Sequence, residues 1–277
     1  ILDIVVVDRP SLNAFAAPGG VVGVNLGLFL QANDVHEFSS VIAHELAHLS
    51  QRHFARRVEE RRSGSLTTMA SMIAGLLIGA AGGTDAALAT ISLAQAASQG
   101  NQLRYSRERE IEADRIGLAT MVNAGLDPNG ASRMFERMQR AYRFTRRPPE
   151  FLLTHPLSET RIADAKNQAR SYPTREPQRS IAFQMMKVKV EGLYETNPIV
   201  SLQKYKKLVE KDSSNIAARY GLSLALVKNS SFEEAVNEFE ALRPRLPNTI
   251  LMLAAYAEVL ASAGQHQKAE KIVEKRL

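Results

Sequence analysis

The pattern of apolar and polar positions divides the chain into a short strand-rich start and a long helical remainder. β-Branched runs at 1–7 and 20–24 are separated by a stretch rich in Pro, Asn and Gly, which is typical of short strands joined by turns. Apolar residues then recur at helical spacing through 38–49 and predict one long helix over about 35–57. We therefore expect an α+β fold that is mainly helical.

Capping signals place three further helices in the first part of the chain. A second long helix is predicted over about 107–123, and Gly125 is well placed to end it. Asp127 and Pro128 supply the cap and the first position of the next helix, which runs to about residue 143. Ser158 then begins a helix that ends near residue 170, after an irregular stretch that opens with two prolines.

Beyond the polar, proline-containing run at 172–179 the chain is helical and carries an internal repeat. Aligning Ser223 with Ala257 gives a period of 34 residues, the length of a tetratricopeptide helix pair, and a generic helical bundle is the alternative. We expect two domains, at 1–175 and 180–277. Because the chain starts without a methionine and stops just after a predicted helix, we also expect an incomplete N-terminus and a repeat array that is cut short.

The composition narrows the chemistry open to the chain. There are 35 Lys and Arg residues against 29 Asp and Glu, a formal charge of +6, but the basic residues are not interleaved with aromatic residues on a recognisable nucleic-acid-binding module. We therefore expect no nucleic-acid partner. The chain contains no cysteine, so it forms no disulfide, and any metal must be held by histidine and carboxylate side chains.

The strongest chemical signal is the run HELAH at 44–48, inside the first predicted long helix. A four-residue separation places His44 and His48 on one face of a helix, one turn apart, where two imidazoles can bind one metal ion. Glu45 lies beside them and can reach a water molecule on that metal without being a ligand, which makes it the candidate general base. The pattern predicts a zinc-dependent hydrolase.

A catalytic zinc ion needs a third protein ligand and an open fourth position. The candidates lie on the second long helix and are Glu108, Glu110, Glu112 and Asp114. Glu110 and Asp114 share a face, so one can bind the metal while the other orients a ligand histidine through its second ring nitrogen. Glu112 points away from that face and is interpreted as a solvated charge. Spacing alone leaves open which carboxylate is the ligand.

HELAH and the later run EIEADRIG at 110–117 together resemble the signature of the HtpX and BepA family of gluzincin metallopeptidases, in which HExxH is followed on a later helix by ExxxD. The resemblance implies that Glu110 is the third ligand of one Zn²⁺ per chain and that Asp114 orients a ligand. The runs LNAFA at 12–16 and LTHPL at 153–157 are also similar to that family. A gluzincin metallopeptidase domain over 1–175, followed by a tetratricopeptide-like domain over 180–277, is the fold that this resemblance implies.

The family's function sets the expectations for this chain. The resemblance implies a zinc-dependent endopeptidase acting on unfolded or misassembled proteins, in periplasmic quality control of outer-membrane proteins in a Gram-negative bacterium. It also implies that the repeats dock to outer-membrane assembly machinery. We expect the substrate to add to a sheet edge, and the residues of that strand are Asn13, Ala14, Phe15 and Ala16. The alternative is a chaperone or scaffold with a latent protease site that binds the machinery through its repeats.

Three other histidines and one arginine require separate interpretation. His36 and His53 do not share the metal-facing stripe and are interpreted as surface or packing residues. His155 lies in a proline-flanked stretch; it is either a loop histidine bonded to a backbone carbonyl, or a fourth zinc ligand that displaces water and holds the enzyme off. Arg161 either stabilises an oxyanion or forms a salt bridge within its domain.

Residues 66–100 differ in character from the rest of the chain. They are rich in Ala, Gly, Ser, Leu and Ile, and Asp85 is their only charge. Their apolar run at 69–81 is shorter than the roughly 20 residues of a membrane-spanning helix. We interpret the segment as a helical flap that packs near the metal site, with peripheral membrane contact as the alternative.

Overall fold

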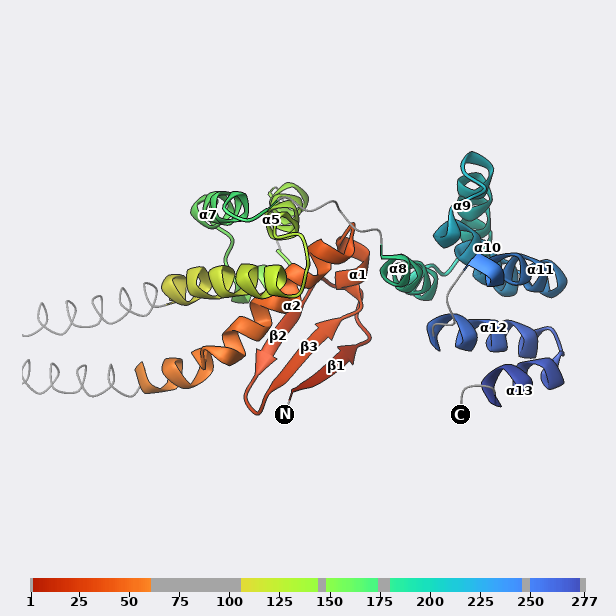
Figure 1. The fold of residues 1–277 in the computed structure, drawn as a ribbon, viewed down its shortest axis with the longest axis horizontal. Coiled ribbons are helices and arrows are strands. Elements are labelled where there is room, and N and C mark those ends of the chain that lie inside the picture. Colours follow the sequence, from red (N-terminus) through yellow and green to blue (C-terminus); the bar gives the residue numbers. More distant parts are fainter. Residues whose placement is uncertain (1, 61–105, 144–147, 174–179, 246–249, 275–277) are drawn as a thin grey trace, which may run out of the picture. The chain divides into compact units, whose positions relative to one another are not determined.

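The computed structural model describes residues 2–60, 106–143, 148–173, 180–245 and 250–274 (Figure 1). These residues are mainly helical and include one small sheet, which confirms the predicted fold class at that level. None of their helices is long and apolar enough to span a membrane. The segment 66–100, interpreted from the sequence as a flap, lies outside the described residues.

The chain divides into two compact units. The first comprises Ile1–Asn25 and His36–Pro177, and the second comprises Leu26–Val35 and Gln178–Leu277. A short piece of the N-terminal part therefore packs with the C-terminal helices. The candidate chemistry of the sequence, from the HELAH run to Arg161, belongs entirely to the first unit.

A three-stranded sheet begins the first unit. Its strands are β1 (Asp3–Val7), β2 (Ala14–Ala17) and β3 (Val21–Asn25), in the order β1-β3-β2. β1 runs parallel to β3, whereas β2 pairs with β3 in the antiparallel direction, with Ala14 opposite Val24. β3 is the buried central strand, so β2 forms an edge of the sheet. The segment expected to bind substrate is therefore an edge strand.

The first long helix is shorter than the sequence predicts. α2 spans Val35–Ser50, and the chain becomes helical again over 53–60. Between the two helices Arg52 has a φ of 53°, a left-handed conformation that costs a non-glycine residue about 1–2 kcal/mol. The prediction of one helix over 35–57 is therefore wrong. A single left-handed residue redirects the chain here, and no glycine or proline marks the position in the sequence.

The other helices of the first unit begin and end close to their predicted positions. One helix spans 106–123, and Gly125 follows it with a φ of 76°, as a terminating glycine does. α5 (Asn129–Tyr142) starts after Asp127, whose carboxylate accepts a hydrogen bond from a backbone N–H of the first turn. The hydroxyl of Ser158 caps α7 (Glu159–Arg170). The stretch predicted to be irregular instead contains the short helix α6 (Glu150–Thr154).

Apolar side chains from four helices form a core that fixes α2 in place. They are Ala43, Leu118, Met121, Ala131, Phe135, Ile162, Ala165 and Ala169. At the centre of this packing, a Cβ atom on Gly117 would lie only 3.2 Å from backbone atoms of Ala43 and His44. The absence of a side chain at Gly117 therefore lets the helix over 106–123 approach α2 at the turn that carries His44.

The second unit is built from helix pairs that recur at a constant spacing. After α1 (Gly27–Gln31) it contains α8 (Ile181–Tyr194), α9 (Pro198–Lys211), α10 (Ile216–Lys228), α11 (Phe232–Leu242), α12 (Ile250–Ser262) and α13 (His266–Glu274). The first residues of α10 and α12 are 34 positions apart, as are those of α11 and α13. Tyr220, Phe239 and Tyr256 lie in a shared core, with neighbouring ring centroids 5.8 Å apart. The spacing of the helices equals the period found in the sequence.

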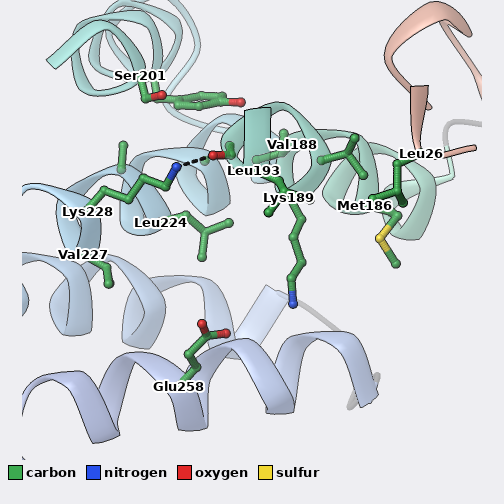
Figure 2. Close-up of a pocket in the computed structure, with 15 residues that line it drawn as sticks. Leu26, Met186, Val188, Lys189, Leu193, Ser201, Leu224, Val227, Lys228 and Glu258 are labelled. Carbon is green, nitrogen blue, oxygen red and sulfur yellow. Dashed lines mark hydrogen bonds between the residues drawn. The ribbon is translucent and has the colours of Figure 1, made fainter. Parts of the chain in front are cut away.

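An apolar cavity of about 340 Å³ lies within the second unit. α8 and α10 contribute most of its lining, including Leu193 and Leu224, and α12 contributes Glu258. Lys189 on α8 and Glu258 on α12 extend toward one another from opposite sides of it (Figure 2). The cavity thus combines a mainly apolar lining with two lysines, Lys189 and Lys228, and one glutamate, Glu258.

Candidate metal centre

α2 brings the two histidines of the HELAH run together. Residues four apart lie one turn above each other on a helix, and the Nε2 atoms of His44 and His48 are 2.9 Å apart. Both residues are buried, at 4% and 8% exposure. The two ring nitrogens therefore point at one small volume that solvent does not fill freely.

The helix over 106–123 supplies a carboxylate to the same volume. The Glu110 carboxylate oxygens lie 3.4 Å from His44 Nε2 and 3.4 Å from His48 Nε2. The close approach at Gly117, two turns further along that helix, explains how a side chain from a separate helix reaches this position. Glu110 is itself buried, at 5% exposure.

His155 completes a group of four. It follows α6, and its Nδ1 lies 3.3 Å from His44 Nε2 and 3.1 Å from Glu110 Oε2. One atom from each of His44, His48, Glu110 and His155 can be chosen so that all four lie within 4.8 Å of one another. Ligands at about 2.0–2.1 Å from a tetrahedral zinc ion are about 3.3 Å apart. The spacing and the donor types therefore fit a metal ion such as zinc.

Asp114 and Arg161 contact the cluster on the side of His44 that faces away from the other ligand candidates. Asp114 Oδ1 lies 2.9 Å from His44 Nδ1, the ring nitrogen that faces away from the cluster. Arg161 donates to both Asp114 oxygens, at 2.7 and 2.8 Å, and its Nη1 lies 3.0 Å from Glu110 Oε2. Of the two interpretations left open for Arg161, the structure favours the salt bridge within the unit.

Burial and neighbouring charges perturb the pKa values of the cluster. Burial by itself lowers the pKa of His44, but the hydrogen bonds to Asp114 and Glu110 outweigh it and raise that pKa to about 10. Burial, reinforced by the nearby His44, lowers the pKa of His48 to about 2. Burial acts to raise the pKa of Glu110, yet hydrogen bonds from His155 and His44 bring it well below its usual range. The cluster thus holds an ionised carboxylate on Glu110 and a neutral imidazole on His48, which a cation can use as ligands, whereas His44 must release a proton before it can bind one.

Glu45 lies on α2 directly beside the cluster and is fully buried, at 0% exposure. Its Oε1 is 3.5 Å from His155 Nε2. Among the described residues, neither of its carboxylate oxygens makes a hydrogen bond of normal geometry. Burial raises the pKa of the Glu45 carboxyl. A buried carboxylate with spare acceptor capacity next to a metal site is suited to exchanging a proton with water.

The residues expected to bind substrate lie on or next to β2. Ala14 is fully buried, whereas Phe15 is 40% exposed and its ring covers Gly23 on the neighbouring strand. Asn13 precedes the strand and donates to a Glu150 carboxylate oxygen at 3.0 Å. The backbone at Ala16 lies close enough to the Glu45 carboxylate to lower its pKa, against the stronger effect of burial. The edge strand therefore passes next to the metal cluster.

Two histidines that the helical pattern sets aside are buried in the structure. His36 and His53 are 2% and 1% exposed, so they are packing residues and the surface alternative is wrong. His53 contacts His48 directly, and the Glu112 carboxylate, interpreted from the sequence as solvated, lies 3.2 Å from His53 Nε2. The sequence does not predict the contact between His53 and His48, because residues five apart on a continuous helix do not share a face. No residue type in the sequence marks the left-handed turn at Arg52 that brings them together.

Three features are those of a metallopeptidase. α2 carries the HExxH run, the helix over 106–123 brings the carboxylates of Glu110 and Asp114 to its histidines, and the edge of a small sheet passes the cluster. The chain belongs to peptidase family M48, whose family model matches residues 2–169.

Curated relatives extend the likeness beyond that domain. The chain is 34% identical over 255 residues to the putative beta-barrel assembly-enhancing protease of Vibrio cholerae, covering 91% of this chain and 52% of that protein. It is 30% identical over 272 residues to the beta-barrel assembly-enhancing protease of Escherichia coli K12, covering 96% of this chain and 54% of that protein. Mitochondrial metalloendopeptidase OMA1 of Schizosaccharomyces pombe is 34% identical over 157 residues, 57% of this chain and 43% of that protein. The chain thus spans about half the length of the bacterial relatives.

Proposed function

We propose that the chain is a zinc-dependent endopeptidase in which His44, His48 and Glu110 hold one zinc ion and Glu45 is the general base. The observation that carries the proposal is the convergence of these three ligand side chains on one buried point, at separations of 2.9–3.4 Å. Membership of family M48 and the metalloendopeptidase names of relatives support it.

Glu45, Asp114 and Arg161 have different roles in the proposed hydrolysis of a peptide bond. Bound zinc supplies Lewis acidity, which polarises a peptide carbonyl and makes a nearby water molecule acidic enough to lose its proton near neutral pH. Glu45 receives that proton and passes it to the leaving amine. Asp114 Oδ1 lies 2.9 Å from His44 Nδ1 and would hold the ring with Nε2 toward the metal, while Arg161 holds Asp114 in place.

The substrate adds to the edge of the sheet as an extended strand. β2 is an edge strand and passes next to Glu45 through Ala16. Main-chain hydrogen bonds to such an edge do not depend on the side chains of the substrate, and they require that the substrate be unfolded locally. Broad side-chain specificity and a preference for unfolded or misassembled proteins follow.

His155 is a fourth ligand that holds the enzyme in a resting state. Its Nδ1 lies within the ligand group, and no hydrogen bond from its ring to a backbone carbonyl occurs among the described residues. A fourth protein ligand occupies the position that a catalytic site keeps open for water or substrate. Activity therefore requires His155 to withdraw.

The cellular role rests on the bacterial relatives. Their names describe proteases that enhance beta-barrel assembly. This likeness supports our proposal that the chain acts in the periplasm of a Gram-negative bacterium, in the quality control of outer-membrane proteins. The helix pairs with a period of 34 residues support a tetratricopeptide-like domain over 180–277 that docks to the assembly machinery. The metallopeptidase domain occupies 1–175.

A second candidate function is a chaperone or scaffold with a latent protease site. The apolar cavity of about 340 Å³ in the helical unit favours it, because a cavity of this size can take an apolar side chain of a bound polypeptide. His155 within the ligand group provides the latency.

Cleavage of casein by the wild type, Glu45→Gln and Glu110→Gln, with zinc content measured on each protein, tests the proposal. We expect one zinc per chain in the wild type and Glu45→Gln, cleavage by the wild type alone, and loss of zinc in Glu110→Gln. Glu108→Gln is the matched control, because Glu108 is an exposed carboxylate on the same helix as Glu110. It should behave as the wild type.

Each outcome selects one account. A wild type that binds no zinc refutes the peptidase. A wild type that binds zinc without cleaving casein, and that gains activity through His155→Ala, establishes the latent protease. A His155→Ala variant with unchanged activity and unchanged zinc coordination refutes the role of His155.

A further inference from the structure

The two histidine ligands of the proposed site are supported in different ways. His44 meets a carboxylate directly, because its Nδ1 lies 2.9 Å from Asp114. His48 meets another histidine: its Nδ1 lies 2.8 Å from Nδ1 of His53, and the ring centroids are 4.8 Å apart. His53 is 1% exposed, so this contact is shielded from water.

The contact between His48 and His53 depends on a break in the helix at Arg52. On a continuous helix, residues five apart point about 140° away from each other, and His53 would lie far from the His48 ring. Arg52, with its φ of 53°, breaks the helix and turns His53 back toward His48. Left-handed conformations of non-glycine residues are unfavourable and persist where the surrounding structure requires them.

His53 also contacts the helix over 106–123, the helix that carries Glu110. The His53 Nε2 lies 3.2 Å from Glu112 Oε2, and the same oxygen accepts a hydrogen bond from Arg56 Nη1 at 2.9 Å. Glu112 is two residues beyond Glu110 on the helix over 106–123. A chain of contacts thus links His48 through His53 to the helix that carries the carboxylate ligand.

The direction of the hydrogen bonds follows from the ligand role of His48. If Nε2 of His48 binds the metal, it carries no proton, so the proton of the neutral ring sits on Nδ1 and is donated to His53. Nδ1 of His53 must then be the acceptor, which places the His53 proton on Nε2, where it is donated to Glu112. Only one arrangement of protons satisfies every contact in the chain.

We propose that His53 is a positioning residue for the metal site, and that the relay of His53, Glu112 and Arg56 fixes the tautomer and the ring orientation of His48. This inference rests on the proposed function, because it requires a metal on Nε2 of His48. Groups that hold metal-binding histidines in this way typically contribute about 10- to 100-fold to metal affinity. The relay does for His48 what Asp114 does for His44.

The test is the dissociation constant for zinc, measured on the full chain by competition with a chelator, together with thermal unfolding of the metal-free protein. His53→Phe keeps the ring volume but cannot accept the proton of His48, and we expect zinc binding to weaken about 10- to 100-fold. His53→Asn places an amide oxygen near the position of Nδ1, and we expect it to recover most of that loss.

Two further variants separate positioning from folding. His36→Phe replaces another buried histidine of the first unit, one that accepts from the Asp127 N–H and lies outside the ligand group. We expect it to lower thermal stability and leave zinc affinity unchanged. Glu112→Gln changes a side chain that is 35% exposed and keeps its shape, so it should fold normally and weaken zinc binding by a smaller factor than His53→Phe.

The outcomes distinguish the relay from the function on which it depends. A wild type without zinc overturns both. A wild type that binds zinc and cleaves casein, with His53→Phe and Glu112→Gln at wild-type affinity, overturns the relay alone. Equal losses of affinity in His53→Phe and His36→Phe, in proportion to their loss of stability, also overturn it, because a merely structural role would have that effect.

Discussion

Replacing Gly117 with alanine should push apart the two helices that form the proposed metal site. The new Cβ atom would lie 3.2 Å from the Ala43 carbonyl carbon and from the His44 nitrogen, and 3.3 Å from the Ala43 oxygen. All three are backbone atoms, which cannot rotate away as a side chain can. The helix over 106–123 must therefore shift by a few tenths of an ångström relative to α2, and Glu110 shifts with it.

Two opposing effects determine how much Gly117→Ala changes the free energy of unfolding. Alanine favours a helix over glycine by about 1 kcal/mol, whereas overpacking a dense core costs about 1–3 kcal/mol. The net result is a free energy of unfolding that is unchanged or lower by up to about 2 kcal/mol. Metal ligands tolerate displacements of only about 0.2 Å, so we expect zinc affinity to fall about 10-fold even where stability hardly changes.

Gly192→Ala is the matched control for this substitution. Gly192 lies in α8, and a Cβ atom there would meet nothing within 4 Å. It should gain up to about 1 kcal/mol from helix propensity and leave zinc binding unchanged. Zinc affinity is measured by chelator competition and stability by thermal unfolding, on both variants. If Gly117→Ala is stabilised as much as Gly192→Ala and keeps wild-type zinc affinity, the close approach does not position Glu110.

Three further predictions concern single side chains. Arg161→Leu leaves the buried Asp114 without the guanidinium that donates to both of its oxygens, so thermal unfolding of the metal-free protein should show a loss of about 3–5 kcal/mol, and unchanged stability would contradict the role of that pair. Arg52→Gly relieves a left-handed residue and should cost no stability, with a gain of up to about 1 kcal/mol and unchanged zinc affinity; lower stability in denaturant titrations would count against the strain. Burial and the hydrogen bond to Glu240 raise the pKa of Tyr256 to about 12, so its contribution to stability is complete below pH of about 10 and is lost as the pH rises toward 12. Urea unfolding followed by circular dichroism should therefore show a smaller alkaline loss in Tyr256→Phe, and identical pH profiles for the two proteins would refute this.

The sequence predicted the ends of helices correctly where a single residue at that end determines them. Ser158 caps α7 and Gly125 ends the helix over 106–123, because the cap residue itself satisfies the end of the helix or adopts its left-handed turn. The single helix predicted over 35–57 was wrong because Arg52 adopts a conformation that its residue type does not favour. The contacts of His53 could not be predicted once that turn was missed.

By itself, the sequence determined that His44 and His48 share one helix face, that a carboxylate follows on a later helix, and that helix pairs recur every 34 residues in the second half. These properties depend on helix geometry and on residues a few positions apart. Only the tertiary structure decided that Glu110, His155 and Arg161 meet at the two histidines, and that His53 stands behind His48. Those contacts join segments separated by the break at Arg52 or by long stretches of chain. They depend on how closely the helices pack, as at Gly117, and no local pattern encodes that distance.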